Sequence, residues 1–251
     1  FVGLENYIDV FTRDDCFNAL KLSLYYMVGS VVQLALALLF ATILSFNPKG
    51  GSFFRGALYF PSLVCGIAVG FIFKYFYTHG FVLDSILGLL GIPEDMLPFW
   101  LKDTRINNWV LVASSIWRYM GQNMVLFIGA IASVDKTQYE AAAIDGANAW
   151  HRFRYIILPS IRTIVVLNMI LAISGSLSVF EIPYVITDGG FGTSTYFVLM
   201  DKLAHANQKV GLASAMAVVL LVLILVVSGI QKLAEKKMNS GVRVGKRRAR
   251  K

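Results

Sequence analysis

Residues 140–159 read EAAAIDGANAWHRFRYIILP and connect two long apolar segments. The first part is a short helix-forming run, in which Ala141 to Ala143 combine the best helix propensity with the smallest side chains. Gly146 follows, and glycine readily adopts the left-handed conformation that ends a helix. A connection that builds two short helices is too organised for a plain linker. We interpret it as a surface to which another protein binds.

The residues around this stretch support two short helices. Asp135 is expected to cap the first helix, with Gln138 at the spacing of a capping box. The second helix is expected to have an apolar face, because four apolar residues recur at helical spacing: Trp150, Phe153, Ile156 and Ile157. Pro159 begins the next apolar segment and disfavours helical geometry at Leu158. The same pattern is open to two other interpretations, an amphipathic helix on lipid and a helix-turn-helix.

The composition places the chain in the membrane class. Hydrophobic residues make up 57% of the 251 residues, charged residues 15%, and the mean hydropathy is +0.64. Soluble domains are usually about 25% charged. The two cysteines, Cys16 and Cys65, predict neither a disulfide nor a metal site, and neither His79 nor His205 is expected to be a metal ligand.

The chain is predicted to be an all-α membrane protein, a polytopic helical bundle formed by a single transmembrane domain over residues 1–251. A membrane helix needs about 20 mainly apolar residues, and five stretches qualify. The predicted spans are residues 19–46, 55–77, 106–133, 160–182 and 209–231, with a connecting loop at 134–159 and a basic tail at 232–251. Helices are expected because backbone groups in lipid must be paired within the segment.

Basic residues are distributed unevenly between the two sets of connections. The richer set is Lys49, Arg55, Lys136, Arg152, Arg154, Arg162, Lys232, Lys236, Lys237, Arg243, Lys246, Arg247, Arg248, Arg250 and Lys251. The poorer set is Arg13, Lys21, Lys102, Arg105, Lys202 and Lys209. The positive-inside rule therefore predicts that the loop at 134–159 and the C-terminus are cytoplasmic.

This topology explains the net charge of +8 without nucleic acid, and anionic lipid is the expected partner of the tail. A nucleic-acid role for the tail is the weaker alternative. With five spans and a cytoplasmic C-terminus, Phe1 is expected outside, and a further span is expected upstream of it.

The stretch that opens this section resembles the EAA motif of permease subunits of binding-protein-dependent ABC importers. The matching residues are Glu140, Ala141, Ala142, Gly146, Ile156, Leu158 and Pro159. Asp145 to Ala147 match the longer form of the carbohydrate-uptake branch. Val2 to Tyr7 and Thr187 to Gly190 resemble two further segments of that branch. The family pattern continues with Pro where this chain has Phe191, which leaves the shape of that turn open.

The resemblance implies that the loop is a coupling helix docked in a cytoplasmic ATPase. The implied ATPase-coupling residues are Glu140, Ala141, Ala142, Asp145, Gly146 and Ala147. It also implies a second permease subunit, expected to differ from this one, an extracellular or periplasmic solute-binding protein, a carbohydrate solute and a bacterial cell membrane. The chain has no GxxxxGK[ST] sequence, so it is not expected to be an enzyme or to carry a cofactor. ATP and Mg are expected in the partner ATPase.

Polar residues within the predicted spans are the candidate substrate path. Arg118 is costly in a membrane, so it is expected to face the bundle interior, with Gln122 one turn away and Asn123 beside it. Ser174, Ser178 and Glu181 are predicted to share one helix face, and Glu181 is a candidate partner of Arg118. These groups either line the path of a hydroxyl-rich solute or tie helices and subunits together.

Two further classes of function stay open at this point. The first is a permease for another solute, such as a polyamine, phosphate or glycerol-phosphate. The second is a membrane scaffold or sensor that docks a signalling protein. An enzyme has little support, because no catalytic arrangement of His, Asp, Ser or Cys converges at one membrane depth.

Overall fold

The structure, a computed structural model, describes residues 2–46 and 48–248, with side chains as far as residue 233 and at residue 235. Phe1, Arg250 and Lys251 lie outside the described residues. All regular secondary structure in the described part is helical, as predicted. The helices are α1 (Glu5–Thr12), α2 (Asp14–Ser45), α3 (Gly51–Leu63), α4 (Gly66–Tyr77), α5 (Val82–Leu89), η1 (Glu94–Met96), α6 (Asn107–Ala132), α7 (Lys136–Ile144), α8 (Ala149–Arg152), η2 (Phe153–Ile157), α9 (Leu158–Ser160), α10 (Arg162–Ser176), α11 (Glu181–Thr187), α12 (Tyr196–His205) and α13 (Val210–Arg248).

The five predicted spans correspond to long helices or to consecutive helix pairs. Three described stretches are long and apolar enough to cross a membrane, with mean hydropathies of 2.3, 2.1 and 3.0: Asp14–Ser45, Arg162–Thr187 and Val210–Leu233. The bent pair α3 and α4 is a fourth if it forms one span. α6, with 26 residues, matches the remaining span in length but carries more polar side chains. α13 continues past its predicted span, so residues 232–248 extend the helix.

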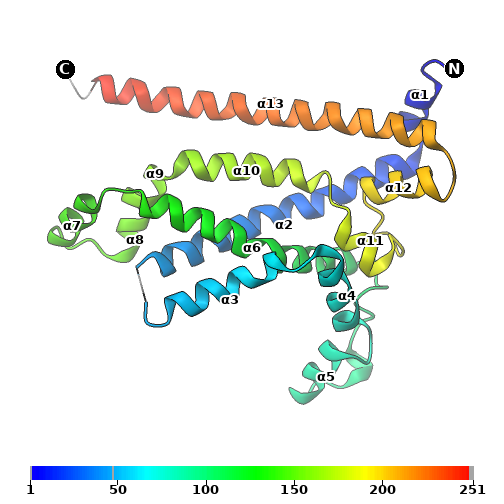
Figure 1. Cartoon of the computed structure of the whole chain (residues 1–251), viewed down its shortest axis with the longest axis horizontal. Coiled ribbons are helices and arrows are strands. Elements are labelled where there is room, and N and C mark those ends of the chain that lie inside the picture. Colours follow the sequence, from blue (N-terminus) through cyan, green and yellow to red (C-terminus); the bar gives the residue numbers. More distant parts are fainter. Residues whose placement is uncertain (1, 47, 249–251) are drawn as a thin grey trace.

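The helices lie roughly side by side, and the two sets of basic connections gather at opposite ends of the molecule (Figure 1). One end contains α7, α8 and the far end of α13, together with the turn between α2 and α3. The other end contains α1, α5, α11 and α12. The arrangement agrees with the predicted separation of the two sets.

The second predicted span is broken rather than continuous. α3 and α4 meet at an angle of 99°. Pro61 lies inside the last turn of α3, where proline removes a backbone donor and favours a kink. Val64 then adopts an extended conformation with ψ of 135°, and Gly66 begins α4. The break turns the start of α4 toward the interior of the bundle.

Close packing of α6 on its neighbours depends on small residues. A Cβ on Gly121 would overlap the backbone carbonyl of Leu58 on α3, and a Cβ on Gly29 of α2 would overlap Val112. Gly121 therefore allows α3 and α6 to approach closely. Gly129, on the same helix, has nothing within 4 Å of the place that a Cβ would occupy in the described chain.

The outer turn at 187–192 is held against the start of α6. Asn107 Nδ2 donates to the carbonyl of Phe191 at 2.7 Å, and Asn108 Nδ2 donates to that of Gly192 at 3.2 Å. Phe191 has a φ of 51°, which a proline ring forbids. A proline at position 191, as in the family pattern, could not adopt this conformation, so the turn of this chain differs in shape from the turn of that pattern.

A cluster of buried apolar side chains fills the end of the molecule that carries α7 and α8. We call it the loop-end cluster, and its members are Leu34, Ala37, Ala41, Leu44, Met124, Phe127, Ala130, Ile131, Val134, Ile157 and Ile161. It joins α2 and α6 to the segment that follows α8. The loop is thus attached to the same helices that form the centre of the bundle.

We predict that Gly121→Ala destabilises the protein by about 1–3 kcal/mol, because a methyl group would force α3 away from α6. Gly129→Ala is the matched control on the same helix and is expected to be neutral or slightly stabilising, since alanine is the better helix former. Thermal unfolding of the two purified variants in detergent measures the difference. Equal unfolding temperatures would contradict the packing role of Gly121.

Candidate functional site: an exposed coupling loop and a polar cavity

The first helix of the loop is capped at both ends. Asp135 Oδ1 accepts a hydrogen bond from the Thr137 N–H at 3.0 Å, as predicted, and this bond holds the pKa of the Asp135 carboxyl below its ordinary value. At the other end, Ala147 N–H donates to Ala142 O at 2.8 Å and Gly146 N–H to Ala143 O at 3.2 Å. Gly146 has a φ of 71°. These bonds form a Schellman motif, so the predicted left-handed stop is confirmed.

The second helix of the loop does not end before Pro159, and the expectation for Leu158 was wrong. Leu158 has helical dihedral angles, φ −56° and ψ −44°. The chain passes through a π-helical turn over Phe153–Ile157, where the Leu158 N–H donates to the Phe153 carbonyl five residues back. Pro159 then lies in the first turn of α9, where a missing N–H costs little.

One face of the loop is anchored and the other is bare. Ile157 and Ile161 are buried in the loop-end cluster, and Tyr139 packs against it. On the other side, Ile144 is 88% exposed and Trp150 is also exposed. Of the predicted coupling residues, Glu140, Ala141, Asp145 and Gly146 are exposed, and Ala142 and Ala147 are half-buried. Exposed apolar residues on a rigid support are typical of a docking surface.

A cavity of about 570 Å³ lies between α2, α6, α10 and the segment that enters α11. Hydroxyl and amide groups line much of it, together with aromatic rings and one carboxylate. The polar lining residues are Tyr26, Ser30, Gln33, Ser115, Tyr119, Gln122, Asn123, Asn168, Ser176, Ser178 and Glu181. Such a lining offers both donors and acceptors to a polar solute, and it carries little net charge.

The structure places four of the six predicted path residues on the cavity wall: Gln122, Asn123, Ser178 and Glu181. Arg118 and Ser174 are not among the residues that line this cavity. Ser174 Oγ lies 3.1 Å from Ser228 Oγ on α13 and ties two helices together. The expected common face of Ser174, Ser178 and Glu181 was wrong, because α10 ends at Ser176 and α11 begins only at Glu181, so the helical periodicity is interrupted between them.

The other seven polar lining residues were missed as site candidates, among them Gln33, Asn168 and Tyr119. Gln33 is only 7% exposed, and within the described chain its amide forms no hydrogen bond, so it is directed to the cavity. Asn168 donates to the Ile164 carbonyl at 3.1 Å, which leaves its amide oxygen as an acceptor. Tyr119 supplies an aromatic face. A signal existed for Gln33, because an amide in a charge-free membrane segment is itself a functional hint.

Arg118 and Glu181 form the predicted ion pair at the edge of the cavity. Arg118 also lies over the ring of Tyr119, 4.8 Å from its centroid. A Cβ on Gly66 would overlap the Glu181 carboxylate, so the start of α4 lies directly against the pair. The positive end of a helix dipole favours a carboxylate at that place. The pair therefore joins α6, α11 and the break between α3 and α4.

The fold and this site agree with one family of membrane proteins. Residues 33–240 match the family of binding-protein-dependent transport system inner membrane components. The chain belongs to this family, the permease subunits of binding-protein-dependent ABC importers, and it is a transport component of the inner membrane.

Several relatives are similar over most of their length. The chain is 30% identical over 231 residues to the probable ABC transporter permease protein YesP of Bacillus subtilis (strain 168), with 89% of this chain and 74% of that protein covered. It is 32% identical over 238 residues to the arabinooligosaccharides transport system permease protein AraP of the same organism, with 91% and 74% covered.

A solved structure shares the fold. It is a bacterial ABC transporter involved in the import of the acidic polysaccharide alginate. A chain of that transporter superposes with a TM-score of 0.86 at 18% identity, covering 94% of this chain and 84% of the other.

We predict that the Arg118–Glu181 pair is strongly coupled in stability. Glu181→Leu should destabilise more than Arg118→Leu, because it leaves an arginine that is only 12% exposed without its partner. The double variant should recover part of the loss, with a coupling energy of about 0.5–3 kcal/mol from unfolding measurements. The exposed pair Arg13–Asp15 is the control, where coupling should not exceed about 1 kcal/mol. Additive losses at Arg118 and Glu181 would contradict the interpretation.

A second prediction concerns the end of α7. Gly146→Ala should weaken the Schellman motif, because the left-handed conformation costs alanine about 1–2 kcal/mol. No neighbouring atom lies within 4 Å of the added Cβ, so this conformational cost is the only effect expected. Gly146→Asn is the control that tolerates this conformation better. Hydrogen exchange at the Ala147 N–H, which is bonded to Ala142 O, should become about 5- to 30-fold faster in the alanine variant. Identical exchange in both variants would exclude strain at this residue.

Proposed function

We propose that this chain forms the translocation path for a sugar or oligosaccharide in an ATP-driven importer, and that its 134–159 loop couples the path to a cytoplasmic ATPase. The observation that carries the proposal is the physical continuity between the two sites. The loop is seated on the loop-end cluster, and this cluster is built from α2 and α6. The same two helices line the polar cavity. A push on α7 therefore acts on the cavity walls through close-packed side chains.

The loop would dock in a groove of the ATPase through its bare face. Ile144 and Trp150 would supply the apolar contacts, while Glu140, Asp145 and the small residues Ala141, Ala142, Gly146 and Ala147 surround them. ATP and Mg would act in the two ATPase subunits, whose approach would move the loops. In this proposal the loop and the C-terminus would lie in the cytoplasm.

The cavity would accept a solute rich in hydroxyl groups. Gln33, Asn168 and Asn123 offer amide donors and acceptors, and the ring of Tyr119 offers an apolar face of the kind that packs on a sugar ring. Arabinooligosaccharides and the starch degradation products of a third relative, from Thermoanaerobacterium thermosulfurigenes, are cargoes of this kind. A second permease subunit would close the remaining side of the cavity, and an external binding protein would deliver the solute.

The docking of the loop is tested by Ile144→Ser, which removes an exposed apolar contact without disturbing the fold. Loss of one such anchor is expected to cost more than about 1 kcal/mol in binding, so co-purification with the ATPase should fall about fivefold or more. Leu89→Ser is the matched control, because Leu89 is 89% exposed at the opposite end of the molecule. Equal retention of the ATPase by both variants would contradict coupling through this loop.

The cargo is tested with the assembled complex in liposomes. Uptake and ATPase stimulation are measured with neutral oligosaccharides, acidic oligosaccharides, a polyamine, phosphate and glycerol-phosphate. We expect stimulation by a neutral oligosaccharide, and we expect Gln33→Leu to reduce its uptake while assembly is unchanged. Stimulation by only a charged solute would identify a different permease, and assembly without any uptake would favour a scaffold or sensor.

A further inference from the structure

The outer loop between α4 and α6, residues 78–106, has little apolar packing of its own. All of these residues are described, and among them only Asp84 and Leu97 are buried. Several of its large apolar side chains, including Leu90 and Met96, face outward. A loop of this length without a hydrophobic core needs another kind of interaction to keep its shape.

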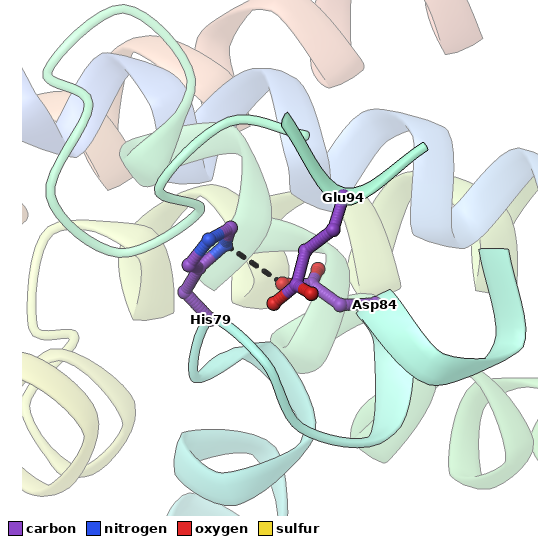
Figure 2. Close-up of side chains that lie close together, drawn as sticks. All are labelled: His79, Asp84 and Glu94. Atoms are coloured by element: carbon purple, nitrogen blue, oxygen red, sulfur yellow. Dashed lines mark ion pairs between the residues drawn. The ribbon is translucent and has the colours of Figure 1, made fainter. Parts of the chain in front are cut away.

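A compact group of three potential metal ligands lies inside this loop (Figure 2). His79, Asp84 and Glu94 point toward one another, and their ligand atoms all lie within 4.8 Å of each other. His79 Nδ1 lies 2.7 Å from Asp84 Oδ2. His79 comes from the turn after α4, Asp84 from α5 and Glu94 from η1, so one site connects all three parts of the loop.

The backbone and Trp100 hold the central carboxylate of this group in place. Gly80 has a φ of 77°, and its N–H donates to Asp84 Oδ2 at 2.7 Å. Trp100 Nε1 donates to Asp84 Oδ1, also at 2.7 Å. Glu94 Oε1 lies close to Gly80, 3.5 Å from the place that a Cβ would occupy, which is an ordinary van der Waals distance. Ligands held in this way by outer hydrogen bonds are typical of metal sites.

The two carboxylates of the group favour the binding of a cation. Asp84 is 5% exposed, and its carboxylate accepts hydrogen bonds from the Gly80 N–H and from Trp100 Nε1. The exposed carboxylate of Glu94 lies within 4.8 Å of it. Among the described residues, their only ion pair is the one between Asp84 and His79. The nearby basic residues are used elsewhere, since Arg105 pairs with Asp103 and Lys102 lies over Phe99.

The imidazole is also incompletely bonded. His79 Nδ1 is buried and, within the described chain, has no hydrogen-bond partner of suitable geometry despite its closeness to Asp84. The ring of His79 is positioned against Phe99, with centroids 4.5 Å apart. The closeness of His79 Nδ1 to Asp84 is therefore an ion pair rather than a well-aligned hydrogen bond.

We propose that His79, Asp84 and Glu94 bind a divalent transition-metal ion, with zinc as the best fit, and that this ion fastens the outer loop. One imidazole nitrogen and two carboxylate oxygens suit zinc, whereas calcium and magnesium prefer oxygen ligands alone. Water would fill the fourth position. Neighbouring ligands of a tetrahedral zinc ion lie about 3.3 Å apart for bonds of about 2.0–2.1 Å, so His79 and Asp84 would separate slightly on binding.

The ion would act by closing the loop, because it joins three segments that apolar packing leaves weakly connected. The proposal does not depend on the cargo or on ATPase coupling, since the cluster lies at the end of the molecule opposite α7.

The test uses the full chain in nanodiscs, without an affinity tag of histidines, after treatment with a chelator. Equilibrium dialysis with zinc, followed by elemental analysis, should give one zinc per chain. His79→Ala and Glu94→Gln should each weaken binding about tenfold or more. Zinc at about 100 times its Kd should raise the unfolding temperature of the unsubstituted chain by about 5 °C or more, and calcium should not.

The matched control is His205→Ala. His205 and Asp201 form the other described His–carboxylate pair, with Nδ1 3.1 Å from Oδ1, but no third ligand accompanies them. Zinc binding should therefore be unchanged in this variant. Glu94 is exposed, so Glu94→Gln is expected to fold even if His79→Ala does not. Absence of zinc binding, or equal binding by the Glu94→Gln chain and the unsubstituted chain, would overturn the proposal and leave an ion pair between His79 and Asp84.

Discussion

The pairing of Arg118 with Glu181 is the interaction on which the outer half of the bundle depends. An arginine within a membrane helix requires a partner, because an isolated charge there costs several kcal/mol. Glu181, the first residue of α11, supplies this partner just after the break that separates α10 from α11. Its carboxylate in turn fits only because Gly66 has no side chain and because α4 begins there. The break after α3, the turn before α11 and the sequence of α6 are thus parts of one arrangement.

At the end of the molecule that carries α7 and α8, apolar packing rather than an ion pair holds the helices together. The loop-end cluster joins α2, α6 and the residues that follow α8 into one close-packed unit. Since such interiors transmit displacement rather than absorb it, the bare face of α7 and the cavity wall are mechanically connected. The cavity lies between this cluster and the ion pair. Both ends of its wall are therefore firmly supported, while its lining consists of side chains that retain free donors and acceptors.

Much of the local structure could be predicted because it depends on neighbouring residues. The cap at Asp135 and the left-handed stop at Gly146 follow from side-chain chemistry within a few residues. The partnership of Arg118 with Glu181 could be predicted from the cost of a charge in a membrane. The break at residues 177–180 could not, because its largely apolar local composition suits a continuous helix. For the same reason Ser174 was assigned to the wrong surface. For the break at residue 64, Pro61 was a signal that the assignment of a continuous span did not use.

By itself, the sequence determined the class of fold, the approximate places of the long apolar helices, and the caps of the first helix in the 134–159 loop. These properties depend on hydropathy, charge and short-range spacing. The tertiary structure alone decided which polar side chains share a cavity, and it brought His79, Asp84 and Glu94 into one group. The physical reason is that both results depend on contacts between segments distant along the chain. Those contacts are set by the bends at Pro61 and Gly66 and by the close approach of helices at glycines. The local periodicity of the sequence does not predict such contacts.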